Sequence, residues 1–81
     1  MNLWNKINEL KENYDSSSPE HELLKEIRFW MKDVVRGCLI ESNLDLAMAC
    51  INCYENTKNY NENLVDSLKE IIIGGYKLIK K

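Results

Sequence analysis

Apolar residues recur at intervals of three and four along most of the chain, which is the spacing of one face of an α-helix. In the first segment the pattern is formed by five residues: Leu3, Trp4, Ile7, Leu10 and Tyr14. They fall within about 100° of arc on a helical wheel. This predicts a short amphipathic helix over about residues 2–14, which needs a docking surface because so short a helix does not persist alone in water.

A second helix is predicted from Pro19 to about Ile40. Ser18 can act as N-cap, Pro19 suits the first helical position, and carboxylates follow at Glu20 and Glu22. These three features are typical of a helix start. The wide apolar stripe of this helix consists of Leu23, Leu24, Ile27, Trp30, Met31, Val34, Val35 and Cys38.

A third helix is predicted over about residues 43–58, with Ser42 or Asn43 as its cap. Its apolar residues go most of the way round the wheel: Leu44, Leu46, Ala47, Met48, Ala49, Cys50, Ile51, Cys53 and Tyr54. A helix that is apolar nearly all round is usually buried. We therefore expect this helix to be the central one of the fold.

The fourth helix is predicted over about residues 61–79, capped by Asn61 or Asn63. Its apolar stripe keeps the same phase on both sides of Gly74 and Gly75. This continuity favours one helix that passes through the glycines, with another backbone close to Gly75. The alternative is a helix that ends at Ile73 with a glycine C-cap.

Four amphipathic helices with short connections indicate an all-α fold, a small antiparallel four-helix bundle in which residues 1–81 form a single domain. The first helix is short, so one side of the bundle could be open. A second copy of the chain could close that side as a homodimer.

The amino-acid composition limits the classes of function that the chain could have. The 81 residues are 44 % hydrophobic and 30 % charged, with a formal net charge of −2. This balance argues against a nucleic-acid partner, and no apolar run is long enough for membrane insertion. Three cysteines without a secretory segment suggest reduced thiols and a cytoplasmic protein.

Catalytic chemistry has little support. The pair Cys50 and Cys53 forms a C-x-x-C, but it sits in the middle of a predicted helix rather than at a helix start or on a zinc knuckle. His21 is the only histidine and has no evident nucleophile beside it. The sequence therefore predicts a protein that is not an enzyme and has no metal and no cofactor.

Phe29 and Ile40 depart from the pattern, because they fall on the charged side of the second predicted helix, near Lys32 and Arg36. Ile73 is a similar exception on the fourth helix. Apolar residues ringed by charges are typical of protein–protein interfaces. We predict that these five residues contact another protein.

The sequence thus indicates a small helical protein that acts by protein–protein binding, as an adaptor, inhibitor or regulatory factor. Its size and its Asn- and Lys-rich composition suit a phage or mobile-element factor that binds a host protein. Three alternatives stay open: a self-associating structural subunit, a bundle that resembles bacteriocin-immunity proteins in size and helix count, and a metal or redox protein that uses Cys50 and Cys53.

Overall fold

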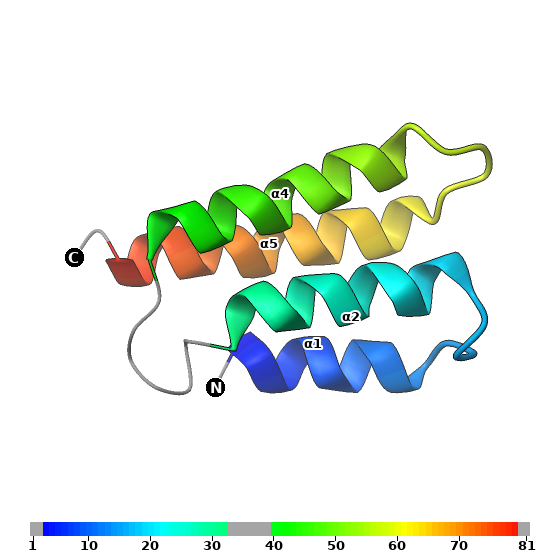
Figure 1. Cartoon of the computed structure of the whole chain (residues 1–81), viewed down its shortest axis with the longest axis horizontal. Helices are drawn as coiled ribbons and strands as arrows, with labels where there is room; N and C mark the ends of the chain where they lie inside the picture. Colours follow the sequence, from blue (N-terminus) through cyan, green and yellow to red (C-terminus); the bar gives the residue numbers. More distant parts are fainter. Residues whose placement is uncertain (1–2, 33–39, 80–81) are drawn as a thin grey trace.

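The computed structural model describes residues 3–32 and 40–79, and every statement below about what is present or absent concerns these ranges. They form four helices and no strand: α1 (Leu3–Glu12), α2 (Pro19–Met31), α4 (Glu41–Glu55) and α5 (Glu62–Ile79). The direction of the chain reverses from each helix to the next (Figure 1). The predicted small all-α bundle is confirmed.

The helices form a ring around one core. α1 contacts α2, α2 contacts α4, α4 contacts α5, and α5 returns to contact α1 (Figure 1). The interior is filled by side chains with no measurable exposure: Ile7, Leu24, Ile27, Met31, Leu44, Ala47, Ile51, Leu68 and Ile72. Because α1 reaches α5, the chain closes this ring by itself.

Two of the expected helix starts carry the side-chain caps that the sequence predicts. Ser18 Oγ accepts a hydrogen bond from the His21 backbone N–H at 3.1 Å, and Pro19 takes the first helical position. Asn61 Oδ1 accepts from the Leu64 N–H at 3.1 Å. Each cap satisfies a backbone donor that the first turn of a helix leaves without an intrahelical partner.

The predicted boundary between the second and third helices is wrong. α2 ends at Met31 with Lys32 as C-cap, rather than at Ile40. Ile40 has extended backbone angles and is the N-cap of α4, without a side-chain cap bond. α4 therefore begins before Ser42. Apolar spacing alone does not mark where a helix ends; the predicted stripe residues Val34, Val35 and Cys38 lie outside the described residues.

The third helix is also less buried than expected. In α4 one face is buried, formed by Leu44, Ala47, Ile51 and Tyr54. The opposite face is also apolar but exposed at Leu46, Ala49 and Cys53. α4 packs mainly against α2 and α5, and none of the described helices covers its second apolar face.

α5 runs through both glycines to Ile79 as one helix, as the helical wheel predicts, and does not end at Ile73. Gly75 is buried between two other helices. A Cβ built on it would lie 2.8 Å from Leu44 Cδ2 of α4 and 3.5 Å from Leu3 Cδ1 of α1. The absent side chain lets α5 approach both neighbours closely, which offsets the low helix propensity of glycine.

Candidate functional site

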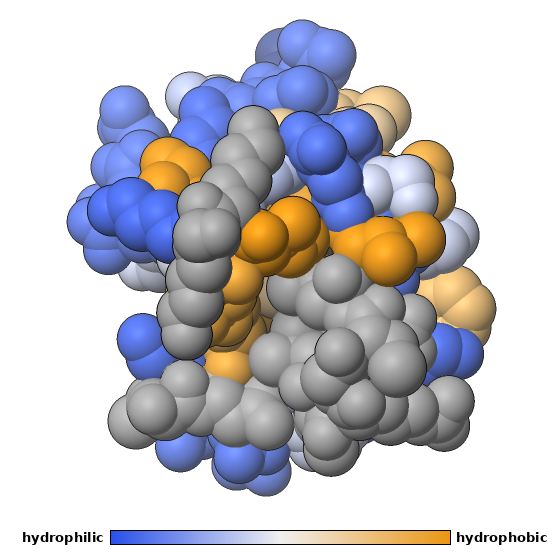
Figure 2. Space-filling model, turned by 90° about the vertical axis from the view of Figure 1, so that its left-hand side faces the viewer, coloured by the Kyte–Doolittle hydropathy of each residue, from blue (hydrophilic) through white to orange (hydrophobic). Residues whose placement is uncertain are grey.

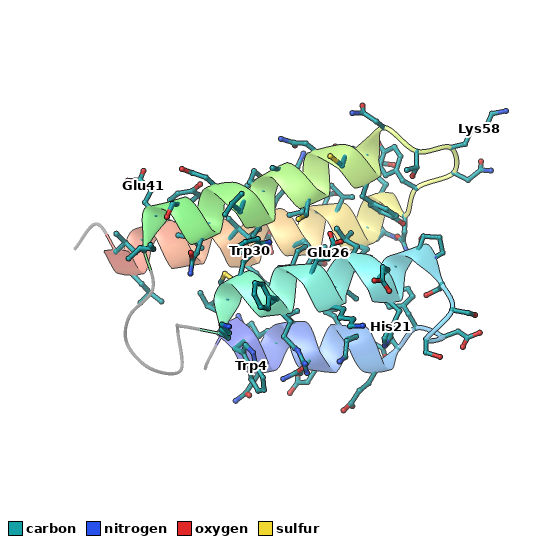
Figure 3. All side chains as sticks on the ribbon, in the orientation of Figure 1. Trp4, His21, Glu26, Trp30, Glu41 and Lys58 are labelled. Atoms are coloured by element: carbon teal, nitrogen blue, oxygen red, sulfur yellow. The ribbon has the colours of Figure 1, made fainter. Side chains whose placement is uncertain are left out.

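The described surface has a groove between α2 and α4, with a volume of about 560 Å³. We call it the α2/α4 groove. It is lined by Glu22, Lys25, Glu26, Phe29 and Trp30 of α2 and by Leu46, Ala49, Cys50 and Cys53 of α4. Figure 3 shows Glu26 and Trp30 on the side of α2 that faces α4.

The groove exists because the second apolar face of α4 lies beside an exposed aromatic residue of α2. Phe29 is 53 % exposed and Leu46 is 43 % exposed. Phe29 meets the neighbouring Trp30 edge to face, with ring centroids 5.0 Å apart, and this contact restrains both rings. Ala49 and Cys53 have small side chains, so the side of the groove that α4 forms projects little.

The two described thiols of the groove differ in environment. Burial raises the pKa of Cys50, and a hydrogen bond with the nearby Glu26 carboxylate raises it further. A raised pKa disfavours the reactive thiolate. Cys53 is exposed and carries a free thiol. Among the described residues, no cluster of three or more His, Cys, Asp or Glu could hold a metal ion.

A second hollow of about 290 Å³ adjoins the groove on the other side of α2. We call it the basic hollow. Its lining consists of Trp4, Lys25, Arg28, Phe29 and Lys32, three cations and two aromatic rings. Figure 3 shows Trp4 on α1, which forms the far wall. Lys25 and Phe29 line both hollows, so they form the ridge that separates them.

Aromatic rings hold two of these cations. The Arg28 guanidinium lies 5.5 Å from the ring centroid of Trp4, and Arg28 Nη1 donates to Asn8 Oδ1 at 3.1 Å. Lys32 Nζ lies 4.2 Å from the ring centroid of Phe29. Both are cation–π distances. Within the described residues, none of the three cations of the basic hollow forms an ion pair with a carboxylate.

The opposite end of the bundle carries a polar network that joins its connections. Tyr54 donates to Glu20 Oε2 at 2.5 Å and accepts from the Asn61 backbone N–H at 2.8 Å. Asn61 Nδ2 in turn donates to the Tyr14 hydroxyl at 3.3 Å. This network links α2, α4 and both connections, and its members position the helices rather than line a hollow.

The structure brings together two of the five predicted binding residues. Phe29 and Lys32 lie side by side in the basic hollow, and Phe29 also lines the groove. Ile40 and Ile73 are exposed by 55 % and 48 % but line neither hollow. Arg36 lies outside the described residues.

Several groove residues were missed by sequence reasoning, although a signal for them exists. Leu46, Ala49, Cys50 and Cys53 follow the spacing of a second apolar stripe on α4. The prediction of a fully buried helix hid this stripe. Trp4 and Arg28 could not be paired from sequence, because their contact depends on how α1 lies along α2.

A further apolar region lies at one end of the bundle. Figure 2 shows apolar side chains gathered at the end that lies on the left in Figure 1. Ile40 before α4 and Leu78 in the last turn of α5 are exposed by 55 % and 50 %. Neither residue borders the groove.

A search for helices able to cross a membrane found none in the described part of the chain. Comparison of the sequence with protein-family models and with curated proteins, and of the fold with solved structures, produced no match.

Proposed function

We propose that this protein acts by binding another protein, and that an amphipathic helix of the partner docks in the α2/α4 groove. The observation that carries the proposal is the exposed second apolar face of α4, which lies beside Phe29 in a groove of about 560 Å³. An apolar helix face laid into a groove of this kind is a common mode of peptide recognition.

The energetics of the groove suit such docking. Phe29 and Leu46 each have about half of their surface in water, and covering them gains roughly 25 cal/mol for every Å² of apolar surface buried. Aromatic anchors near the middle of an interface usually contribute most to affinity. Phe29 and Trp30 already restrain each other, so little side-chain entropy is lost when a partner covers them.

The role that fits this site is that of a non-catalytic adaptor, inhibitor or regulatory factor. The raised pKa of Cys50 lowers the fraction of reactive thiolate, which disfavours a role as a nucleophile. Two free thiols beside the groove suit a reducing compartment such as the cytoplasm.

The test places a photo-crosslinking amino acid at position 49 of the full chain, in place of Ala49. The labelled protein is expressed in its native host cells. Ala49 is exposed and lines the groove. Asn52, which is exposed on the same helix but does not line the groove, provides the matched control position. We expect a discrete adduct with one cellular protein at position 49 and not at position 52.

The adduct is then checked with purified components. Ala49→Arg should fill the groove and weaken binding of the identified protein at least about tenfold, whereas Asn52→Arg should leave it unchanged. Adducts that form equally at both positions, or that contain only a second copy of the chain, would contradict the proposal.

A further inference from the structure

We infer that the partner helix carries a row of carboxylates along one flank, which the basic hollow binds. This inference rests on the proposed function, because it specifies the chemistry of the helix that occupies the groove. It adds a second surface to the site and a direction to the docked helix.

The two hollows share one boundary. Lys25 and Phe29 line both, and they are one helical turn apart on the outer ridge of α2. A helix seated in the groove has one flank against this ridge. Side chains on that flank reach over Phe29 into the basic hollow, where Arg28 and Lys32 lie.

The basic hollow favours anions strongly for a protein with a net charge of −2. Among the described residues, its lining holds three cations and no carboxylate. None of the three is neutralised by an ion pair with a described carboxylate. Arg28 is held by Trp4 and Asn8, and Lys32 by Phe29. These contacts place the charges before the partner arrives, which reduces the entropy lost on binding.

The charges of the groove also have a direction. Glu22 and Glu26 line it towards the start of α2, with Lys25 between them, whereas Arg28 and Lys32 of the adjoining basic hollow lie towards the end of α2. A matching helix therefore places its carboxylates near the end of α2 and its basic residues near the start. Charges at a rim mainly set specificity and the association rate.

A second copy of the chain matches this site poorly. The large apolar side chains exposed in the described residues are Phe29, Ile40, Leu46, Ile73 and Leu78. Only Ile73 and Leu78 share a helix, and a spacing of five does not place them in one row. The exposed apolar row of α4 in a second copy holds one large side chain, Leu46, beside the small Ala49 and Cys53, so it offers little that could fill the groove.

Nucleic acid is also disfavoured as the occupant. A polyanion that follows α2 would meet Glu22 and Glu26 next to the cations, and the groove floor presents apolar side chains rather than donors for phosphates. An acidic amphipathic helix satisfies both the apolar floor and the neighbouring cations.

Three synthetic helical peptides of about 18 residues test the inference. They share one apolar face and carry Glu, Gln or Lys at the same flanking positions. Affinity for the intact protein is measured by fluorescence anisotropy at about 0.05 M and about 0.5 M salt. At low salt we expect the Glu peptide to bind at least about tenfold more tightly than the Lys peptide, and we expect high salt to reduce the difference.

Two charge variants localise the effect. Lys25 and Lys32 are exposed, so the double variant Lys25→Glu with Lys32→Glu should keep the fold and reverse the order of the Glu and Lys peptides. Lys58→Glu with Lys77→Glu makes the same change of net charge at exposed positions outside the site and should leave the order unchanged.

The outcomes separate the inference from the proposed function. Equal affinities for the three peptides, all weakened by Ala49→Arg, would overturn the inference and leave the groove as a protein-binding site. A Glu preference that survives the Lys25 and Lys32 changes would also overturn it. Absence of binding by any peptide, or binding that Ala49→Arg does not weaken, would overturn both.

Two further probes examine the other occupants. A labelled single-stranded oligonucleotide that binds where the Glu peptide does not would overturn the inference in favour of nucleic acid. Sedimentation of the protein alone would overturn it in favour of a second copy, if a dimer forms that the Lys25 and Lys32 changes abolish.

Discussion

Gly75 of α5 lies against the side chain of Leu44 of α4, so closely that an added Cβ would be 2.8 Å from Leu44 Cδ2. Leu44 has no measurable exposure and little room to move. We expect Gly75→Leu to lower the free energy of unfolding by roughly 1–3 kcal/mol, because it overpacks this contact. Urea denaturation followed by circular dichroism measures the change.

Gly74 provides the control for this prediction. A Cβ at Gly74 would lie 3.8 Å from Leu3 Cδ2, an ordinary contact distance. Gly74→Ala should therefore raise the free energy of unfolding by up to about 1 kcal/mol through its better helix propensity. Equal effects of the two substitutions would show that the contact with Leu44 is not tight.

Phe29 should matter for binding and little for folding. It is 53 % exposed, so Phe29→Ser should change the free energy of unfolding by less than about 1 kcal/mol, while it weakens a groove-bound partner. Ile27, two residues earlier, has no measurable exposure, and Ile27→Ala should cost about 2–5 kcal/mol. If Phe29→Ser instead lowers the free energy of unfolding as much as Ile27→Ala does, Phe29 belongs to the core.

The Tyr54 hydroxyl should contribute to stability through its two hydrogen bonds. Tyr54→Phe leaves the Asn61 backbone N–H without its acceptor and Glu20 without its donor. A partly buried donor that loses its partner costs about 1–3 kcal/mol. Tyr60→Phe is the matched control, because its ring contacts Tyr54 edge to face and its hydroxyl forms no hydrogen bond within residues 3–32 and 40–79. The prediction fails if both variants unfold at the same urea concentration.

Stability should fall at alkaline pH. The hydrogen bond from Tyr76 to Asp45 raises the pKa of Tyr76 to about 12, whereas tyrosine in an unfolded chain has a pKa near 10. Between these values the folded state keeps a proton that the unfolded state loses, so the free energy of unfolding decreases as pH rises. Below about pH 10 this contribution is fully present.

The variant Tyr76→Phe isolates this effect. Thermal unfolding midpoints between about pH 9 and about pH 11.5 should fall less steeply for the variant than for the unchanged protein. Burial and then the hydrogen bond to Glu20 also raise the pKa of Tyr54, so part of the decrease should remain. Parallel curves for the two proteins would contradict the assignment to Tyr76.

The two groove thiols should react at different rates. Cys53 is exposed, whereas burial raises the pKa of the half-exposed Cys50 and lowers its thiolate fraction. In a Cys38→Ala background, iodoacetamide at about pH 8 should modify Cys53 first. Mass spectrometry of peptides sampled over time measures both rates. Faster modification of Cys50 would contradict the described environment of the groove.

Sequence reasoning located the features that depend on local chemistry. Ser18 and Asn61 cap helices because a short polar side chain can reach the free backbone donors of a first turn. Gly75 stands in the apolar stripe of α5, and its phase alone predicted a continuous helix with a close neighbour.

The features that were missed depend on the arrangement of helices in space. An apolar helix such as α4 is buried on all sides only if neighbours cover all sides, and the ring supplies two. Leu46 therefore faces the groove rather than the core. Likewise Trp4 belongs to the apolar stripe of α1, yet it is only half-buried and lies under the Arg28 guanidinium.

The order of the helices has a consequence for how fast the protein folds. The connections 13–18 and 56–61 join helices that contact each other, and both lie at the same end of the bundle (Figure 1). Most helix contacts thus link segments that are near in sequence, and such low contact order is associated with folding in microseconds to milliseconds. The bond between Tyr14 and Asn61 spans most of the chain, so it can form only after the two helical hairpins have met.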